Sequence, residues 1–174
     1  MTRVELRSVE QTRELGQRLA AVLRAGDLVI LDGPLGAGKT VLTQGIGAGL
    51  GVQGEVTSPT FVIARVHRPM AGGRGLPLVH VDAYRVGGIA EVDDLDLDTG
   101  LDEAVTVVEW GEGKVEQLND VHLLVRLRRH DDDTREAVLV GVGADWTRRL
   151  AALASGDDVG DADRERVDAA RHGR

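Results

Sequence analysis

Several absences limit what this chain of 174 residues can be. Cysteine is missing, so disulfide bonds and thiolate metal sites are excluded. The N-terminal segment M-T-R-V-E-L-R-S-V-E-Q contains no apolar run, so we expect neither a signal peptide nor a membrane span. These features predict a cytoplasmic protein that does not act at a membrane.

An excess of positive charge is also missing. The chain has 21 lysines and arginines against 29 aspartates and glutamates, and its formal net charge is -8. Strong autonomous binding of nucleic acid requires a concentrated basic face that neutralises phosphates. We therefore expect any role with nucleic acid to depend on a protein partner.

Aromatic residues and lysines are scarce, which makes their positions informative. The aromatic residues are Phe61, Tyr84, Trp110 and Trp146. The two lysines are Lys39 and Lys114. A chain that otherwise uses arginine has therefore kept Lys39 inside the glycine-rich stretch L-D-G-P-L-G-A-G-K-T, which runs from Leu31 to Thr40.

The length and the order of the predicted elements favour a single α/β domain. We expect residues 1–154 to form it and residues 155–174 to be a disordered charged tail, because the tail has too few apolar residues to bury. Ser8 followed by Gln11 indicates a capping box, and a continuous apolar run follows at Leu28–Leu31. Helices are predicted at 8–24, 38–50 and 145–153, strands at 4–7, 28–31, 61–66, 76–81 and 104–108, and a hairpin over 121–142. Weaker helical signals lie at 86–101 and after Gly111.

The glycine-rich stretch fits the phosphate-binding pattern G-x-x-x-x-G-K-[ST], between a predicted buried strand and a predicted helix. In such a loop, backbone N–H groups surround the phosphates of a nucleotide such as ATP, the lysine meets the outer phosphates, and the hydroxyl binds Mg²⁺. The residues expected to contact the nucleotide here are Gly33, Leu35, Gly36, Ala37, Gly38, Lys39 and Thr40.

Missing motifs narrow the class of nucleotide-binding protein. The guanine-reading N-K-x-D is absent, since the single asparagine, Asn119, is followed by Asp120 and Val121. The transporter signature L-S-G-G-Q is absent as well. GTP specificity of that type is therefore disfavoured, whereas a small-molecule kinase stays open.

Three further motifs follow the glycine loop: T-S-P-T-F at Thr57–Phe61, H-V-D-A-Y-R at His80–Arg85 and V-V-E-W at Val107–Trp110. In this order and spacing the chain resembles the TsaE family, the ATPases of bacterial threonylcarbamoyladenosine tRNA modification, from about Ser8 to Trp146. The resemblance implies a three-layer P-loop domain with a mainly parallel sheet, helices on both faces and a C-terminal hairpin. It also implies slow Mg²⁺-dependent ATP hydrolysis, TsaB and TsaD as partners, and contact with tRNA only through that complex.

The motifs supply candidate catalytic and metal-binding side chains. Asp82 and Glu109 each end a predicted strand, where carboxylates can hold Mg²⁺ together with Thr40 or orient an attacking water. With the resemblance, Lys39, Asp82 and Glu109 are the expected catalytic residues. From the residues alone, two acids at strand ends are as readily solvated and inactive.

Other motif residues have two interpretations each. Thr60 is expected to contact the nucleotide as part of a switch that senses the terminal phosphate, although Ser-Pro also marks ordinary turns. Arg135 resembles a family arginine near the nucleotide, or is a surface arginine of the hairpin. His80 is more readily structural than a metal ligand, because Mg²⁺ prefers oxygen. Trp110 either packs in the core or at its rim, or, by the resemblance, flanks the nucleotide site and the partner surface.

Two other functions remain open at this stage. One is a nucleotide-dependent binding module that needs ATP bound but not hydrolysed, and the other is the small-molecule P-loop kinase. A kinase requires a phosphorylated product, and a turnover assay with and without partners separates the three functions.

Overall fold

The computed structural model describes residues 1–58, 64–83, 100–110 and 119–155. In chain order the elements are β1 Thr2–Leu6, α1 Val9–Val22, β2 Leu28–Asp32, α2 Lys39–Leu50, β3 Ala64–His67, β4 Leu78–Asp82, β5 Val105–Glu109, β6 His122–Arg129, β7 Arg135–Val142 and α4 Ala144–Ser155. None of the helices in these ranges is both long and apolar enough to cross a membrane. Most expected elements are present, and the strand predicted at 61–66 is described only from Ala64 onward.

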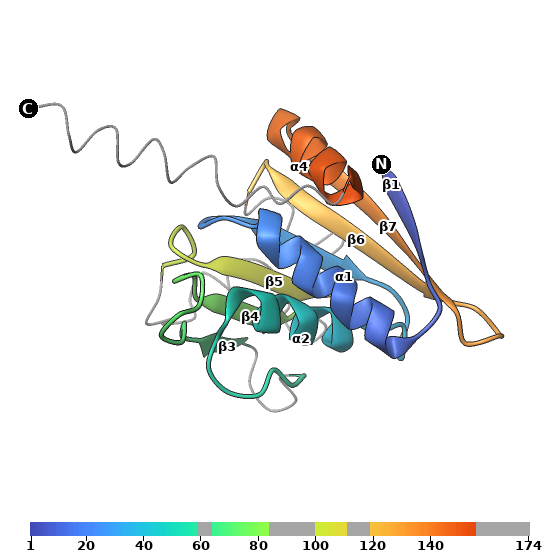
Figure 1. Ribbon diagram of the computed structural model, residues 1–174, viewed down its shortest axis with the longest axis horizontal. Helices are drawn as coiled ribbons and strands as arrows, with labels where there is room; N and C mark the ends of the chain where they lie inside the picture. Colours follow the sequence, from blue (N-terminus) through green and yellow to red (C-terminus); the bar gives the residue numbers. More distant parts are fainter. Residues whose placement is uncertain (59–63, 84–99, 111–118, 156–174) are drawn as a thin grey trace, which may run out of the picture.

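The seven strands form one mixed sheet in the order β1-β7-β6-β2-β5-β4-β3 (Figure 1). The four central strands, β6, β2, β5 and β4, run parallel, while β7, β1 and β3 pair antiparallel at the edges. This arrangement confirms the expected α/β class, its parallel core and its C-terminal hairpin. Because β2, β4 and β5 are parallel, their carboxyl ends lie side by side at the same end of the sheet, which is where ligands bind in open α/β folds.

The central strands are apolar because both of their faces are covered. Successive residues of β2 point to opposite sides, so Val29 and Leu31 join one hydrophobic cluster while Leu28 and Ile30 join the other. The larger cluster is covered by α1, α2 and α4, which lie on the same face of the sheet (Figure 1). The helical segments expected at 86–101 and after Gly111 fall almost entirely outside the described residues, as does the tail from 156 onward.

Glycines let α1 and α2 approach closely. A Cβ atom at Gly16 of α1 would collide with the backbone of α2, and one at Gly45 of α2 would collide with the carbonyl of Arg13 in α1. Gly49 likewise faces Ala20 and Gln17 across the contact. The helix that follows the glycine loop is thus held tightly against its neighbour.

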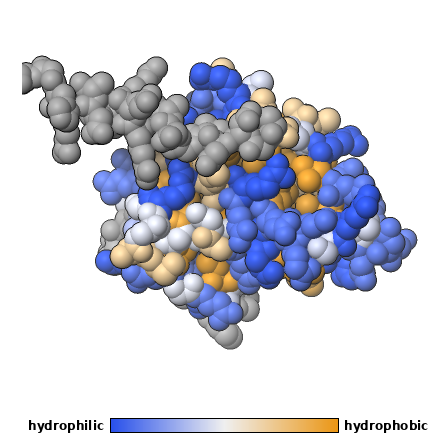
Figure 2. Space-filling model, in the orientation of Figure 1, coloured by the Kyte–Doolittle hydropathy of each residue, from blue (hydrophilic) through white to orange (hydrophobic). Residues whose placement is uncertain are grey.

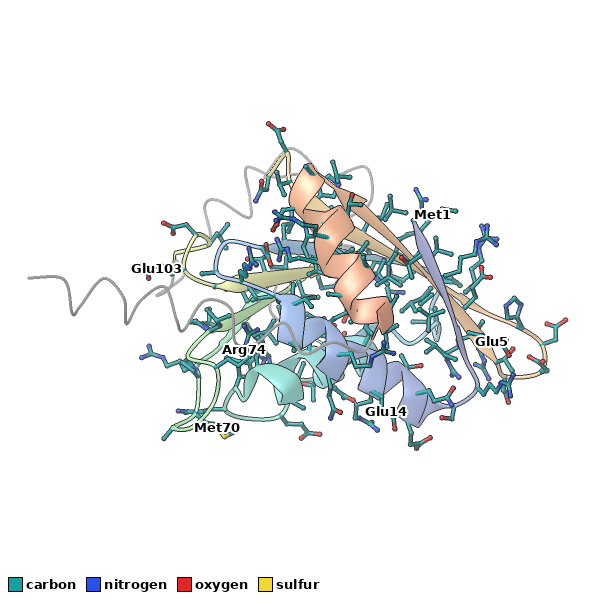
Figure 3. All side chains as sticks on the ribbon, turned by 45° about the horizontal axis from the view of Figure 1, so that its top comes forward. Met1, Glu5, Glu14, Met70, Arg74 and Glu103 are labelled. Carbon is teal, nitrogen blue, oxygen red and sulfur yellow. The ribbon has the colours of Figure 1, made fainter. Side chains whose placement is uncertain are left out.

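Helix α1 begins where it was predicted to begin and ends earlier than predicted. The Ser8 Oγ accepts a hydrogen bond from the Gln11 N–H at 3.1 Å, and the Gln11 Oε1 accepts one from the Arg7 N–H at 2.7 Å. The helix ends at Val22 rather than Arg24, because Leu23 is already extended. Arg74 closes this end from a distant loop, donating to the carbonyls of Ala20 and Leu23 (Figure 3).

A buried ion pair anchors the last helix. Arg149 of α4 donates from both terminal nitrogens to the Asp27 carboxylate, at 2.5 and 2.9 Å, and its guanidinium lies 3.9 Å from the centre of the Trp146 ring. Trp146 is fully buried. The outer surface on the side of the sheet that carries the helices is mostly hydrophilic (Figure 2), so the apolar residues of the helices are largely turned toward the sheet.

Candidate functional site

The glycine loop connects the end of β2 to the start of α2. Gly33, Gly36 and Gly38 all have positive φ angles, of 147°, 79° and 108°. Residues other than glycine rarely adopt these φ angles, which explains why the pattern has glycine at these positions. Gly38 is the N-cap of α2 and carries no capping side chain, so the N-terminus of that helix opens toward the loop.

Lys39 is the first residue of α2 and is largely buried, with 5% of its surface exposed. Its Nζ donates to the carbonyl oxygens of Gly33 at 2.5 Å and Pro34 at 3.0 Å. It also lies 3.7 Å from the centre of the Trp110 ring, which is a cation–π contact. Burial lowers the pKa of Lys39, and the carboxylate of Glu109 opposes this shift.

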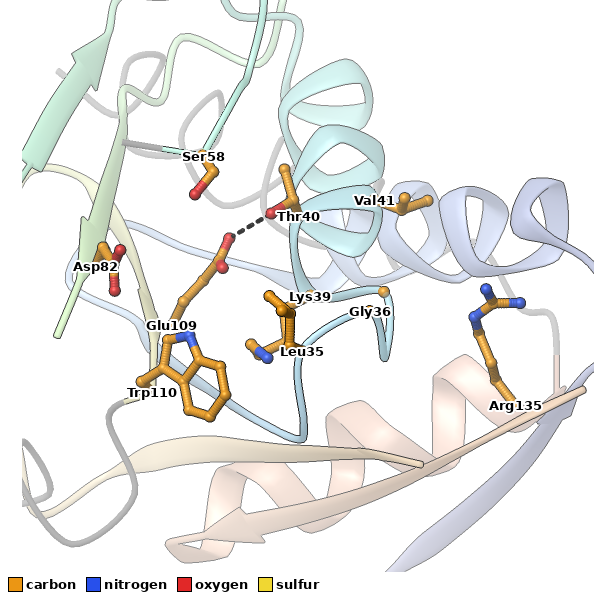
Figure 4. Close-up of a pocket in the computed structure, with 11 residues that line it drawn as sticks. Leu35, Gly36, Lys39, Thr40, Val41, Ser58, Asp82, Glu109, Trp110 and Arg135 are labelled. Atoms are coloured by element: carbon orange, nitrogen blue, oxygen red, sulfur yellow. Dashed lines mark hydrogen bonds between the residues drawn. The ribbon is translucent and has the colours of Figure 1, made fainter. Parts of the chain in front are cut away.

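Glu109 joins the loop helix to the neighbouring strands. Its Oε1 accepts a hydrogen bond from the Thr40 hydroxyl at 3.2 Å (Figure 4) and lies 2.8 Å from Nε2 of His80. Glu109 and His80 are both buried. The carboxylate predicted at this strand end is therefore buried and lies beside the glycine loop.

The parallel pairing of β4 and β5 brings the two predicted acids together. Asp82 is the register partner of Glu109, and the Ala83 N–H donates to the Glu109 carbonyl at 2.9 Å. Directly after Glu109 the chain turns at Trp110, which has a φ of 61°, and the Trp110 N–H donates to the Leu31 carbonyl. This turn directs the indole ring over Lys39.

These side chains surround a cavity of about 640 Å³. It is lined by Leu35, Gly36, Gly38, Lys39, Thr40, Val41, Ser58, Asp82, Glu109, Trp110 and Arg135 (Figure 4). Asp82 and Glu109 lie on one side of the glycine loop and Arg135 on the other. The structure thus gathers residues from the loop, two strand ends and the start of β7 around one space large enough for a small ligand.

A few predicted residues lie elsewhere. Gly33 is outside the lining, although its carbonyl holds Lys39. Ala37 is buried in the core, and its N–H donates to the Pro34 carbonyl at 3.1 Å. Thr60 lies outside the described residues, but Ser58 of the same motif reaches the cavity.

The donor set fits magnesium bound with a nucleotide. Thr40, Asp82 and Glu109 offer hard oxygen atoms, and Mg²⁺ usually takes one or two carboxylates plus phosphate oxygens and waters. Among the described residues no group of three or more His, Asp or Glu side chains could hold a metal alone.

Sequence reasoning left the contacts of Trp110 and His80 undecided. Trp110 directly follows Glu109, but the pattern carries no sign of the left-handed turn that brings its ring to Lys39. His80 and Glu109 are 29 residues apart, and only the pairing of β4 with β5 makes them neighbours. Val41 and Ser58 also line the cavity without having been singled out as nucleotide contacts.

Comparisons with known proteins identify relatives of this chain. Residues 6–137 match the family model described as "Threonylcarbamoyl adenosine biosynthesis protein TsaE". A relative from Streptomyces coelicolor, named tRNA threonylcarbamoyladenosine biosynthesis protein TsaE, is 57% identical over 149 residues, covering 83% of this chain and 99% of its own. The Bacillus subtilis protein of the same name is 36% identical over 155 residues, covering 86% and 92%.

A solved structure shares the fold as well. The crystal structure of Bacillus subtilis YdiB superposes with a TM-score of 0.71 at 31% sequence identity, covering 90% of this chain and 95% of that one. The family match includes the glycine loop and both strand-end carboxylates of the cavity. This chain therefore belongs to the TsaE family.

Proposed function

We propose that this protein is a magnesium-dependent ATPase that acts in the biosynthesis of threonylcarbamoyladenosine in tRNA. The observation that carries the proposal is the meeting of Lys39, Thr40 and Glu109 beside one cavity at the phosphate loop. Membership of the TsaE family and the names of the relatives support the biological role. We place its action in the cytoplasm, with TsaB- and TsaD-type proteins as partners.

The residues of the cavity have separable roles in this proposal. The open N-terminus of α2 and the loop N–H groups bind the phosphates. The Lys39 ammonium leaves the carbonyls of Gly33 and Pro34 and donates to the outer phosphates instead. Bound Mg²⁺, held by oxygens of Thr40, Asp82 and Glu109, would neutralise charge on the phosphates.

The carboxylates also orient the attacking water. Asp82 and Glu109 end neighbouring parallel strands and line the same cavity, so a water between them and the terminal phosphate can donate a hydrogen bond to either. Catalysis of phosphoryl transfer depends mainly on such positioning and on charge stabilisation. Arg135, on the other side of the loop, is available to a more distant part of the nucleotide.

We infer that ATP hydrolysis changes the affinity of this protein for its partners. The motif Thr57–Phe61 reaches the cavity through Ser58, so a bound terminal phosphate can bias the conformation of this segment. A partner that binds one conformation better will bind the ATP and ADP states with different affinity. The net charge of -8 is consistent with tRNA being reached through the complex.

The test measures turnover and association together. ATP hydrolysis by the full chain is assayed with and without purified TsaB and TsaD, and the pair is titrated under ATP, a slowly hydrolysed analogue and ADP. We expect slow release of phosphate by the chain alone and tighter association with ATP than with ADP.

Other outcomes identify the competing functions. ATP-dependent association without any hydrolysis indicates a binding module, and a phosphorylated small molecule indicates a kinase. Multi-turnover tRNA modification that continues undiminished when this protein is omitted refutes the assigned role.

A further inference from the structure

His80 lies in the middle of β4, and its side chain is completely buried. Its Nε2 lies 2.8 Å from the Glu109 Oε1, and both groups are shielded from water. Its Nδ1 is buried with no hydrogen-bond partner among the residues that the structure describes. A polar ring in such a place costs free energy, so its contact with the carboxylate calls for an explanation.

The tautomer of the neutral ring follows from these two contacts. If the proton is on Nε2, this nitrogen donates a hydrogen bond to the carboxylate. Nδ1 is then an acceptor, and it is the one ring nitrogen left without a hydrogen-bond partner among the described residues. A proton on Nδ1 would instead bury an unpaired N–H and turn the lone pair of Nε2 toward a carboxylate oxygen. Burying an unpaired donor and opposing two acceptors are both unfavourable, so the ring carries its proton on Nε2.

His80 and Thr40 hold the carboxylate from two directions. Both hydrogen bonds from these side chains end on Oε1 of Glu109, one from the neighbouring strand and one from the loop helix. A metal bound with nucleotide would engage the Thr40 hydroxyl, whereas His80 lies on β4, outside the lining of the cavity, and can keep its bond. The imidazole can therefore hold the Glu109 carboxylate in place both without nucleotide and with nucleotide bound.

We propose that His80 is a positioning residue for the ATPase reaction: its Nε2–H orients the Glu109 carboxylate toward the phosphates. The inference rests on the proposed function, since an oriented carboxylate matters only if ATP is hydrolysed there. Hydrogen bonds that orient a catalytic or metal-binding group contribute about 10- to 100-fold to activity.

A second histidine of the sheet provides a matched comparison. His67 on β3 is also buried, at 7% exposure, and its Nδ1 lies 3.1 Å from the backbone carbonyl of Gln53. It does not line the cavity, and within the described part of the chain its ring contacts the backbone carbonyl of Gln53 and no carboxylate. Replacing His67 therefore measures the cost of losing a buried strand histidine without touching Glu109.

The experiment uses the full chain with three substitutions of His80 and one control. His80→Leu removes the donor, His80→Gln restores a donor near the position of Nε2, and His80→Asn places its donor too close to the backbone to reach Glu109. We expect kcat for ATP to fall about 10- to 100-fold in His80→Leu and His80→Asn, with ATP affinity little changed. His80→Gln should recover most of the rate, and His67→Leu should keep that of the parent.

A readout independent of turnover tests the geometry directly. Nitrogen NMR of the histidine rings in the nucleotide-free parent should show the proton of His80 on Nε2, and Glu109→Gln should perturb that resonance. A ring with its proton on Nδ1 and none on Nε2 overturns the proposal, as does a parent rate in His80→Leu or equal losses in His80→Gln and His80→Leu. If the parent does not hydrolyse ATP under any condition, the proposed function fails first, and with it the role of His80.

Discussion

Replacing Lys39 with alanine tests the candidate site most directly. The lysine is the one positively charged side chain of the glycine-rich stretch Leu31–Thr40, and its ammonium is held 2.5 and 3.0 Å from the carbonyl oxygens of Gly33 and Pro34. In a nucleotide complex the same ammonium would donate to the outer phosphates. The variant should therefore bind ATP more weakly than the parent.

The size of the effect follows from an exchange of partners. A hydrogen bond to a charged group contributes about 1.5–3 kcal/mol. Because the ammonium already has two carbonyl partners and the Trp110 ring without nucleotide, binding replaces contacts and does not simply add them. We expect a loss of about 1.4–2.3 kcal/mol, which weakens ATP binding about 10- to 50-fold.

The fold should survive the same change. Lys39 is 5% exposed, so its removal takes two donors from loop carbonyls but also removes an ammonium that burial has stripped of water. These effects oppose each other, and we expect a net change of about 1 kcal/mol, or a few degrees in the melting temperature. Circular dichroism during heating measures this change.

Nucleotide titration of Lys39→Ala beside Lys114→Ala provides the decisive comparison. Lys114 is the other lysine of the chain and lies outside the glycine loop, so its substitution controls for the loss of one positive charge. Equal ATP affinity in the parent and in Lys39→Ala would refute the assignment of this loop to phosphate binding.

Three further predictions address catalysis, packing and pH. Glu109→Ala should raise the barrier to hydrolysis by about 2–4 kcal/mol while affecting ATP binding less, since the loop and Lys39 still hold the phosphates; single-turnover rates equal to those of the parent would contradict this. Gly45→Ala should lower the free energy of unfolding by about 1–3 kcal/mol, because the new methyl group meets the carbonyl of Arg13; denaturant titration measures it, and an unchanged midpoint would be evidence against the close helix contact. Burial lowers the pKa of His67 below its ordinary 6.5, so the unfolded chain binds the proton first and stability should fall as pH drops through the window below 6.5. His67→Gln should flatten this part of the stability profile, and an identical slope in parent and variant would assign it to other groups.

The local features of the chain were readable because each depends on neighbouring residues. The cap of α1 needs only Ser8 and Gln11, which are three residues apart, and the loop needs glycines where φ is positive. The strand β2 was recognisable from its continuous apolar run. The order and spacing of the motifs were enough to indicate the TsaE family.

The close approach of the first two helices was not predicted. Gly16 and Gly45 each lie within a helix, where glycine is unfavourable for the isolated element. Their value appears only when α1 and α2 are in contact, since a Cβ at either position collides with the other helix. The buried pair of Asp27 and Arg149 is similar, because 122 residues separate its members.

The sequence by itself determined the glycine loop, the helix that follows it and the apolar strands, because turn angles, caps and side-chain alternation are properties of short segments. Tertiary structure alone decided that β4 and β5 lie side by side, which sets Asp82 next to Glu109 and brings His80 to the same carboxylate. It also decided that the ring of Trp110 covers Lys39. Strand order arises from hydrogen bonds and packing between distant segments, so no local pattern specifies which side chains will meet at the edge of the sheet.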